Sequence, residues 1–398
     1  MTVHDAVTFE DAQRRIAEAC AALETHVLSL TAAAGAVLAK TLVAEEDLIP
    51  FARSAMDGYA VIAAQTHVER RFPVGARAYA ERGTPLRHEP GTATAVATGA
   101  PVPLGADAVV PFEDVVARDG SIELLRGVAA GAHIFPPGED ARRGDLLARA
   151  GDVLGPATLG LLAAAGHATV EVVRRPRVTL LTSGEEIVDV SAAPGFGEIR
   201  NSNATSVGAA LAAFGAEVVQ RVHVGDDRVG LAAALTRAAV ASDLIVTTGG
   251  ASVGERDFVK PVLDELGATF AFRSVAMRPG RPTAFARLGE TRVAALSGNP
   301  AAAAVALHEL VRAAVYALAG RRECRLPRVS ARLRGGLHGK GERTYFAFAA
   351  LHVDAEGRLE ATPLSNQCSA LTRTSVDASG FAVVPPARGN VADGETIE

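Results

Sequence analysis

The spacing of apolar and polar residues divides the chain into stretches of different kinds. In residues 8–24 the apolar side chains, Phe9 and Ile16 among them, recur at helical spacing, which predicts an amphipathic helix. Residues 68–150 carry short β-branched runs separated by Gly and Pro, a pattern typical of a mainly β domain. Residues 322–398 are strand-like and Gly-rich without helical periodicity, which indicates a small β-barrel or sandwich.

Between these stretches, from Arg177 to about residue 321, strand-like and helix-like patterns alternate. The run Leu244-Ile245-Val246 is apolar throughout, as in a strand buried on both faces. Such alternation predicts a parallel, doubly wound sheet, in which ligands bind at the carboxyl ends of the strands. Three loops follow predicted strands at this end: TSGEE, TTGGASVGERD and SGNP. The expected fold class is therefore α/β plus β, in several domains.

Composition and charge restrict the classes of partner. The chain has 398 residues, 48% of them hydrophobic, and a formal net charge of −5, so it can build several cores. An acidic balance argues against nucleic acid or an acidic membrane as the partner. Cys20, Cys324 and Cys368 are too far apart for a zinc or redox motif, and no signal peptide or membrane span is recognisable. We expect a cytoplasmic protein.

The loop after Leu244-Ile245-Val246 has the chemistry of an anion site. Hydroxyls and the backbone N–H groups of glycines suit an oxyanion, and a carboxylate and an amine follow them on the next segment. Only three of the 40 basic residues are lysines, which makes the lysine in this segment notable. The candidate residues are Thr248, Gly249, Gly250, Ser252, Asp257 and Lys260.

A second loop, Ser297-Gly298-Asn299, lies between an apolar strand and a long Ala-rich helix. Its Gly permits close approach, Pro300 suits the first helical turn, and the N–H groups that open a helix attract anions. An ordinary strand-to-helix turn with an Asn cap explains the same residues equally well when they are taken alone. Together with the loop at Gly249 in one sheet, this loop becomes a second wall of one site.

The segment RPGRP presents two guanidinium groups, Arg278 and Arg281, on a loop stiffened by proline, with Arg273 just upstream. The planar fork of arginine matches an oxyanion such as phosphate or molybdate. A solvated Arg-rich loop is the alternative interpretation in a chain that uses arginine so widely.

Acidic residues recur beside glycine or at loop tips: Asp57, Asp140, Glu186, Asp226 and Asp257. A Mg²⁺ ion that bridges phosphate oxygens needs only one or two such carboxylates, so a shared metal site is chemically sensible. Each acid taken singly is more often a turn-former or a helix cap. The ten histidines form no paired metal-ligand spacing.

Seven motifs occur in an order and at separations that resemble those of one known family. They are MDGYAV, TGAPVPLGADAVVPFEDV, GEDARRGDLL, TSGEE, GGASVGERDFVK, RPGRP and SGNP. This family is the molybdopterin molybdotransferases (molybdenum insertases, MoeA), which share their fold with the E domain of gephyrin. The resemblance implies a four-domain, elongated homodimer whose doubly wound domain is of the molybdopterin-binding type. It also implies insertion of molybdate into adenylylated molybdopterin, with Mg²⁺-dependent release of AMP, in a cleft between subunits.

The domains expected on this basis are an N-terminal helix that packs on the α/β domain (1–25), an elongated linker domain (26–44 and 141–176), a β-rich domain (45–140), the α/β domain (177–321) and the C-terminal β-barrel (322–398). Transient contact with other cofactor-biosynthesis proteins is expected as well.

The resemblance also implies residue roles. Asp57 and Thr98 are expected in the wall that the partner subunit supplies, with Asp140 nearby. The acids expected to handle Mg²⁺ and the pyrophosphate are Glu186, Asp226 and Asp257. The residues expected to hold the pterin phosphate are Gly249, Gly250, Ser252, Ser297, Gly298 and Asn299. Arg273, Arg278 and Arg281 stand where the family usually has Lys, and Ser369 adds a hydroxyl for molybdate.

The chain departs from the family pattern in four places. RPGRP replaces KPGKP, SGNP replaces PGNP, GGAS replaces GGVS, and Phe348 in RTYFAF stands where a basic residue is frequent. The last departure leaves open a divergent paralogue that binds cofactor as a scaffold, inserts metal poorly, or handles tungstate. A nucleotidyltransferase acting one step earlier is disfavoured, because its domain alone would need nothing like residues 45–150.

Overall fold

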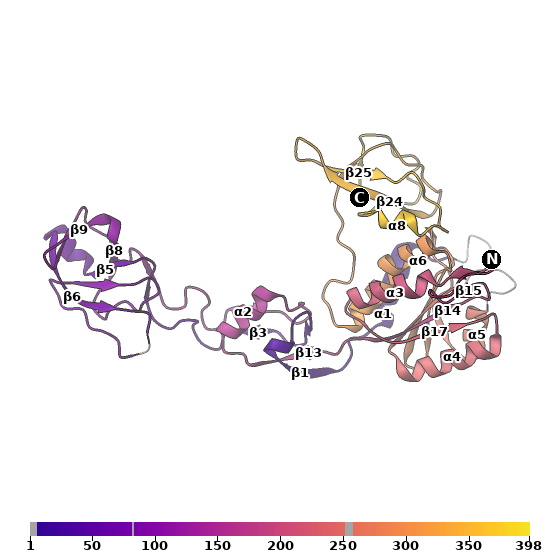
Figure 1. Ribbon diagram of the computed structural model, residues 1–398, viewed down its shortest axis with the longest axis horizontal. Helices are drawn as coiled ribbons and strands as arrows, with labels where there is room; N and C mark the ends of the chain where they lie inside the picture. Colours follow the sequence, from indigo (N-terminus) through magenta and orange to yellow (C-terminus); the bar gives the residue numbers. More distant parts are fainter. Residues whose placement is uncertain (1–5, 82, 251–257) are drawn as a thin grey trace. The chain divides into compact units, whose positions relative to one another are not determined.

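The computed structural model describes residues 6–81, 83–250 and 258–398 (Figure 1). The chain forms two compact units. Unit 1 comprises Met1–Lys40, Ala150–Leu154 and Val170–Glu398, and unit 2 comprises Thr41–Arg149 and Gly155–Thr169. The finer domain boundaries expected from the sequence stay a prediction.

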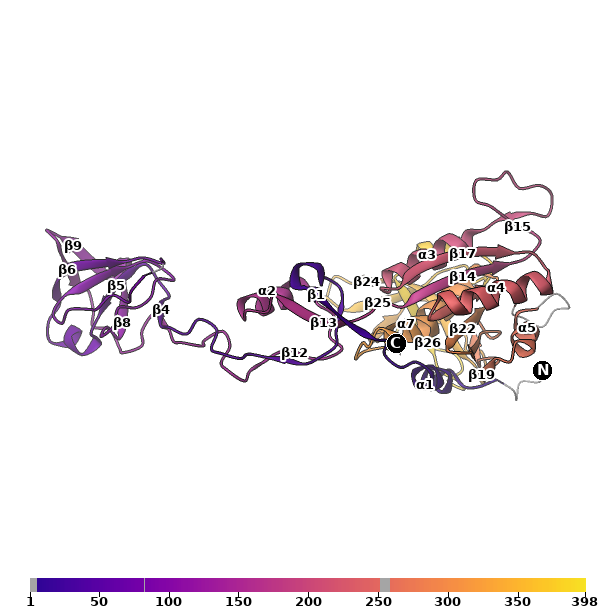
Figure 2. The same ribbon diagram turned by 90° about the horizontal axis from the view of Figure 1, so that it is seen from below.

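Unit 1 is built on a six-stranded sheet in the order β17-β14-β18-β22-β21-β19 (Figure 2). The strands are β14 Arg177–Ser183, β17 Glu217–Val224, β18 Leu244–Thr248, β19 Thr269–Phe272, β21 Ala284–Leu288 and β22 Thr291–Leu296. The first four strands of the order pair in parallel, which confirms the predicted doubly wound sheet. The two at the other edge, β21 and β19, pair antiparallel.

Helices cover both faces of this sheet. They are α1 Phe9–Ala19, α3 Ser202–Ala213, α4 Arg228–Ala241, α5 Val259–Glu265, α6 Pro300–Ala306, the π-helical η5 Leu307–Val311 and α7 Arg312–Leu318. One core joins α1, α3 and the α6-η5-α7 helix to one face, and another joins α4 and α5 to the opposite face. Along β18, Val246 enters the first core and Ile245 the second, and neither is exposed. A strand covered on both faces is expected to be mainly apolar, and in β18 only Thr247 and Thr248 at the carboxyl end depart from this.

The predicted N-terminal helix is confirmed as α1. It begins after Thr8, whose hydroxyl accepts a hydrogen bond from the N–H of Asp11 at 3.1 Å, as in a helix cap. Its apolar stripe, which includes Phe9 and Ile16, is buried against the sheet and α7.

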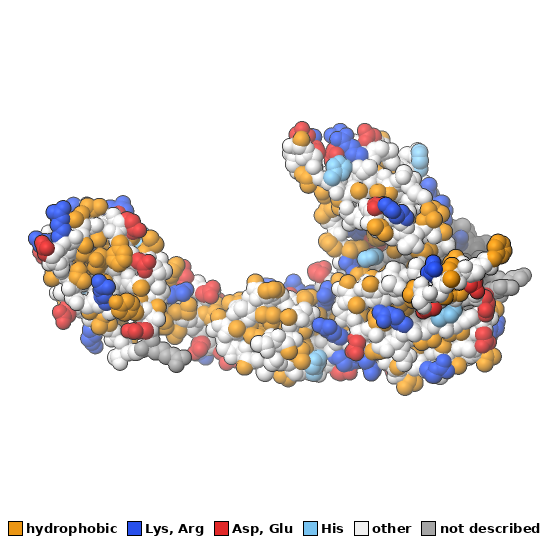
Figure 3. All heavy atoms as spheres, viewed as in Figure 1, with side chains coloured by type: hydrophobic (Ala, Val, Ile, Leu, Met, Phe, Trp, Pro, Cys, Tyr) orange, Lys and Arg blue, Asp and Glu red, His pale blue; other side chains and the backbone are white. Residues whose placement is uncertain are grey.

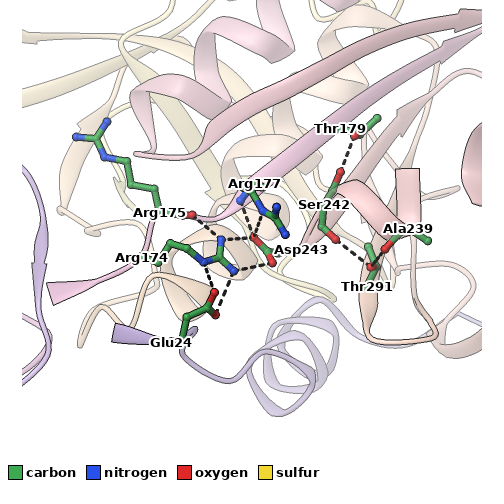
Figure 4. A network of polar contacts seen from close by, with 9 residues as sticks. All are labelled: Glu24, Arg174, Arg175, Arg177, Thr179, Ala239, Ser242, Asp243 and Thr291. Atoms are coloured by element: carbon green, nitrogen blue, oxygen red, sulfur yellow. Dashed lines mark hydrogen bonds and ion pairs between the residues drawn. The ribbon is translucent and has the colours of Figure 1, made fainter. Parts of the chain in front are cut away.

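At the amino ends of the parallel strands, a polar network fixes the strand starts (Figure 4). Arg174 donates to both carboxylate oxygens of Asp243, at 2.8 and 2.9 Å, and also pairs with Glu24. Asp243 accepts from the N–H of Arg177 at 2.7 Å, which ties β14 to β18. The hydroxyl of Thr291, at the start of β22, donates to backbone carbonyls before β18, which connects β22 to the start of β18. This end of the sheet is thus held rigidly by hydrogen bonds, opposite to the end where ligands are expected.

The C-terminal part of unit 1 forms a second six-stranded sheet, which confirms the predicted C-terminal β domain. Its elements are β20 Met277–Arg278, β23 Ala331–Leu333, β24 Thr344–Val353, β25 Leu359–Pro363, β26 Gly380–Val384 and β27 Thr396–Ile397, with the short helix α8 Arg373–Val376. Strand β20 belongs to the RPGRP segment, and its Met277 and Arg278 pair in parallel with Thr344 and Tyr345 of β24. The arginine loop is therefore hydrogen-bonded into the C-terminal sheet.

Unit 2 is mainly β, as the sequence predicts. Its sheet has the order β8-β5-β7-β6-β10-β9, with the bounds β5 Gly58–Val61, β6 Arg71–Ala78, β7 Ala93–Val96, β8 Ala108–Pro111, β9 Val115–Arg118 and β10 Ser121–Leu124. Two strand pairs, β3 Leu42–Val43 with β12 Leu146–Ala148 and β4 Arg53–Ser54 with β11 Ile134–Phe135, and the helix α2 Pro156–Ala164 complete it.

The remaining elements are short. They are β1 Thr25–Ser29, β2 Val37–Leu38 and β13 Thr169–Val173, which form a three-stranded sheet, the pair β15 Ile187–Val188 and β16 Ile199–Arg200, and the 3-10 turns η2 Leu30–Ala32, η3 Ala63–His67 and η4 Phe112–Asp114. On the face drawn in Figure 3, acidic and basic side chains are interspersed among apolar ones. Within the described ranges one helical stretch, Pro300–Leu318, is apolar and long enough to span a membrane, but 78% of its most apolar window is buried inside the protein, as in a core helix.

Candidate functional site

A cavity of about 1290 Å³ opens at the carboxyl ends of the parallel strands of unit 1. Thr182 at the end of β14 is level with Thr248 at the end of β18, which is level with Leu296 at the end of β22. The loops after these strands therefore emerge side by side, and all three line the cavity. This is the edge of the sheet at which the sequence predicts a ligand.

The floor of the cavity is made of glycines that no other residue could replace without a shift. A Cβ on Gly249 would lie 2.3 Å from the carbonyl oxygen of Ser183, and one on Gly250 would lie 2.9 Å from the Ser183 hydroxyl. Both glycines have positive φ, +92° and +60°. A Cβ on Gly298 would lie 3.3 Å from the Cα of Gly249, so the two predicted loops touch. The missing side chains therefore let these loops pack closely against one another.

Two asparagines after β16 fix the loops around the cavity. Asn203 donates from its amide nitrogen to the carbonyl oxygen of Gly298 at 2.9 Å. Asn201 caps α3 through the N–H of Ala204 at 3.0 Å and donates to the hydroxyl of Thr182 at 2.8 Å. Both asparagines line the cavity, and the sequence analysis did not single them out, because it considered the helix-like stretch that starts at Asn203 only as a structural element. The spacing of Asn before a helix was the signal that could have found Asn201.

Two buried polar atoms that border the cavity lack partners within the part of the chain that the structure describes. They are the Oγ of Ser183 and the Oδ1 of Asn203. A buried polar atom without a hydrogen bond costs free energy. These two atoms therefore favour the binding of a ligand that forms hydrogen bonds with them.

The acidic side of the cavity contains Glu186 and Asp226, both among its lining residues. The adjacent acids, Glu185 and Asp227, form hydrogen bonds to the backbone instead. Glu185 accepts from the N–H of Asp226 at 2.8 Å, and Asp227 caps α4 by accepting from Val229 and Gly230. The predicted third acid, Asp257, lies outside the described residues, as does Ser252.

Among residues 6–81, 83–250 and 258–398 there is no group of three or more His, Cys, Asp or Glu side chains that could hold a metal ion. Mg²⁺ keeps several waters and needs only one or two protein carboxylates alongside phosphate oxygens. Glu186 and Asp226 therefore fit Mg²⁺ bound together with a phosphate-bearing ligand, and do not fit a metal cage made of protein alone.

Four arginines line the cavity. They are Arg278 and Arg281, as expected, Arg343 from the segment before β24, and Arg200 of β16. Arg273 is not among the lining residues. It donates to Asp264 at 2.8 Å and its guanidinium lies 3.8 Å from the centre of the Phe270 ring. This hydrogen bond lowers the pKa of Asp264.

The C-terminal domain supplies the remaining wall. Ser369 lines the cavity, and its carbonyl oxygen accepts from the N–H of Ala301 in the first turn of α6 at 3.0 Å. Tyr345 lines it from β24, and burial raises the pKa of this phenol although the charge of Arg278 opposes the shift. Gln367 and Cys368 lie beside Ser369 in the same wall.

Phe348 does not face this cavity. It is 3% exposed, its ring centre lies 5.2 Å from that of Phe381, and its N–H donates to the side-chain oxygen of Gln367 at 2.9 Å. The sequence reasoning therefore looked for the cation of RTYFAF at Phe348, whereas Arg343 of the same segment lines the cavity.

The other predicted site residues lie elsewhere. Lys260 is half-buried in α5 and is not among the lining residues. In unit 2 the structure brings Asp57 and Thr98 together, because the N–H of Thr98 donates to the Asp57 carboxylate at 2.8 Å. Asp140 is an exposed residue of the same unit.

Comparison with known proteins assigns family models to most of the chain. Residues 7–166 match the MoeA N-terminal region (domains I and II), residues 179–317 match a probable molybdopterin-binding domain, and residues 330–398 match the MoeA C-terminal region (domain IV).

Curated relatives and a solved structure cover nearly the whole chain. It is 34% identical to molybdopterin molybdenumtransferase 2 of Mycobacterium tuberculosis, over 98% of both chains. It is 32% identical to molybdopterin molybdenumtransferase of Haemophilus influenzae, over 94% of this chain and 93% of the relative. The structure of the molybdopterin biosynthesis MoeA protein of Pyrococcus horikoshii superposes with a TM-score of 0.79 at 25% identity, covering 98% of each chain. The chain therefore belongs to the MoeA family of molybdopterin molybdenumtransferases.

Proposed function

We propose that the protein is a transferase of molybdenum cofactor biosynthesis that inserts molybdate into adenylylated molybdopterin, with Mg²⁺-dependent release of AMP. The observation that supports this most is the cavity at the strand ends of unit 1, which has a glycine floor, carboxylates on one side and arginines on another. Its volume of about 1290 Å³ suits a substrate larger than a single nucleotide or pterin.

The reaction cleaves a phosphoanhydride, so the protein has to place positive charge near phosphate oxygens and position an oxygen nucleophile. Arg278, Arg281 and Arg343 supply fixed charge that suits both phosphate and molybdate. Glu186 and Asp226 would hold Mg²⁺, which when bound neutralises phosphate charge and orients the leaving AMP. Molybdate itself is the oxygen nucleophile in this proposal, so the site needs no serine or cysteine nucleophile.

Substrate recognition rests on the glycine floor and the buried polar atoms. Gly249, Gly250 and Gly298 let the strand-end loops pack closely and bring their backbone into the cavity lining, where N–H groups suit a phosphate. The unpartnered oxygens of Ser183 and Asn203 offer hydrogen bonds to the polar edge of the pterin.

A scaffold protein with little catalysis is the alternative that the Phe348 departure left open. Arg343 counts against it, because this residue places a cation in the cavity from the same segment.

We further propose that the protein is a cytoplasmic homodimer with transient contacts to other proteins of the pathway. In this proposal Asp57, Thr98 and Asp140 of one subunit complete the cavity of the other. The hydrogen bond between Thr98 and Asp57 supports a joint role for these two residues.

The test measures AMP release from adenylylated molybdopterin with Mg²⁺ and molybdate. Glu186→Gln and Asp226→Asn should each lower the rate about 100-fold or more while substrate still binds, because each removes charge needed in the transition state. Glu290→Gln is the matched control, since Glu290 is 92% exposed and pairs only loosely with Arg287 at 3.7 Å.

Two results would contradict the proposal. Tight substrate binding by the wild-type protein without AMP release would favour the scaffold role. Unchanged rates in both cavity variants would remove these acids from the mechanism.

A further inference from the structure

A second cavity in unit 1, of about 420 Å³, is not used by the proposed reaction. It lies where the α6-η5 helix meets the C-terminal sheet, and its walls come from three places. Ala304 and His308 line it from the helix, Leu326 and Pro327 from the segment before β23, and Phe348 and Phe381 from the sheet. Its size falls in the range of small-molecule sites, and its walls are mainly apolar.

The buried charge beside this cavity is paired within the protein. Arg328 donates to the carboxylate of Glu309 at 2.8 Å, and the Glu309 side chain is fully buried. Burial raises the pKa of Glu309, although Arg328 and Arg312 oppose the shift. Glu398, the other charged group of the lining, is exposed to solvent. A charged ligand would therefore lose hydration in the cavity and compete with an ion pair that is already formed.

Two polar groups of the wall lack a hydrogen-bond partner within the described residues, the Oε1 of Glu309 and the ring of His308. His308 is partly exposed and lines the cavity, and within the described residues its ring nitrogens have no hydrogen-bond partner. Its ring is held edge-on to Phe214, at 5.3 Å between ring centres, and to Phe381, at 6.3 Å. Burial and the charge of Arg312 lower the pKa of His308, so the ring is neutral near pH 7 and can both donate and accept.

We propose that this cavity binds a small uncharged molecule with an aromatic or similarly apolar body and one hydrogen-bonding group that meets His308. Apolar cavities of only about 150 Å³ already bind benzene, so this cavity has room for a larger ring system. The site shares α6 and β24 with the proposed catalytic cavity, which is lined by Ala302 and Tyr345 of the same elements, but the two cavities have no lining residue in common.

Indole is a suitable probe, because it has one N–H group and the chain contains no tryptophan to obscure its fluorescence. Titration of the full-length protein with indole should show saturable binding. Indene, which has the same shape without the N–H, should bind about fivefold more weakly, the effect of one hydrogen bond.

Two variants locate the probe. His308→Phe keeps the aromatic packing and should make the affinities for indole and indene equal. Ala304→Leu fills the cavity and should abolish the binding of both, and Ala378→Leu, at another point of the lining, replaces it if Ala304→Leu fails to fold by circular dichroism. These measurements need no molybdopterin, so they succeed or fail independently of the proposed enzyme activity.

The proposal is overturned if indole does not saturate, or if His308→Phe leaves the preference for indole over indene unchanged. It is also overturned if indole binding weakens as the protein dimerises in analytical ultracentrifugation, since a second copy of the chain would then occupy the cavity.

Discussion

Gly249 combines two constraints that other residues meet only with strain. Its φ is +92°, and a Cβ there would lie 2.3 Å from the backbone oxygen of Ser183. We predict that Gly249→Ala lowers the free energy of unfolding by about 2 kcal/mol, the scale of such backbone strain, and weakens binding of adenylylated molybdopterin. Urea denaturation followed by circular dichroism and a substrate titration measure the two effects.

Gly160 provides the control for this prediction. It lies in α2, is exposed, and a Cβ there would meet no atom within 4 Å. Gly160→Ala should raise stability by about 0.5–1 kcal/mol, because alanine loses less backbone entropy in a helix. Equal stability losses in the two variants would show that Gly249 is not specially constrained.

Most of the predicted site residues line the cavity, because small and charged residues that follow apolar strands form a recognisable pattern. The predicted residues that line the cavity are Glu186, Asp226, Thr248, Gly249, Gly250, Arg278, Arg281, Ser297, Gly298, Asn299 and Ser369. Arg343 was missed because the cation of RTYFAF was sought at Phe348, at the other end of the same segment. Arg273 was placed in the site although its guanidinium pairs with Asp264, a contact that residue type alone does not reveal.

At the scale of elements, the amino ends of the strands depend on Asp243. Its carboxylate is 11% exposed and bonds to Arg174 and to the N–H of Arg177. Asp243→Asn should lower the free energy of unfolding by about 2–3 kcal/mol, because Arg174 keeps its charge but loses its buried partner. Helical circular dichroism measures this well, since the helices other than α2 belong to unit 1.

A matched pair in the same unit gives the comparison. Asp264 is 48% exposed and pairs with Arg273, so Asp264→Asn should change stability by no more than about 1 kcal/mol. If Asp264→Asn costs as much as Asp243→Asn, burial is not what makes the Asp243 network important.

The Asp243 network also predicts a pH dependence. Burial alone would raise the pKa of Asp243, but the hydrogen bonds and charge of Arg174 outweigh it and hold the pKa below its ordinary value. Such a group adds stability above its unfolded pKa of about 3.9, and this is lost as the pH falls through the lower folded pKa. The stability difference between wild type and Asp243→Asn should therefore shrink below about pH 4. A difference that stays constant down to pH 2 would contradict this assignment.

Central elements were easier to predict than edge elements. The run Leu244-Ile245-Val246 is apolar because both of its faces are covered, so its sequence predicts a central strand of the sheet. The antiparallel pairing of β21 and β19 was not predicted, because strand direction depends on connections that periodicity does not encode. The π-helical turn Leu307–Val311 was also missed, since a single wider turn leaves the apolar pattern of a long helix almost unchanged.

At the scale of the whole molecule, the proposed homodimer can be tested by mixing variants. Asp57→Asn and Glu186→Gln should each be nearly inactive alone. If residues of two subunits form one site, half of the dimers in an equal, re-equilibrated mixture are mixed, and each mixed dimer contains one intact site. AMP release should then recover to about a quarter of the wild-type rate.

The control is a mixture of Asp226→Asn with Glu186→Gln, whose changes fall in the same cavity, so no intact site can form. Recovery in neither mixture would contradict a site shared between subunits. Recovery in both would mean that one of the changes does not abolish activity.

The pairing of β20 with β24 limits how this protein can be divided. Met277 and Arg278 belong to the part of the sequence that forms the α/β sheet, yet their strand partners are Thr344 and Tyr345 of the C-terminal sheet. A transplanted α/β domain would therefore leave the arginine loop without the neighbour that aligns it. A chimera within this family should inherit RPGRP and the strand paired with it from one parent, so that both sides of the contact are exchanged together.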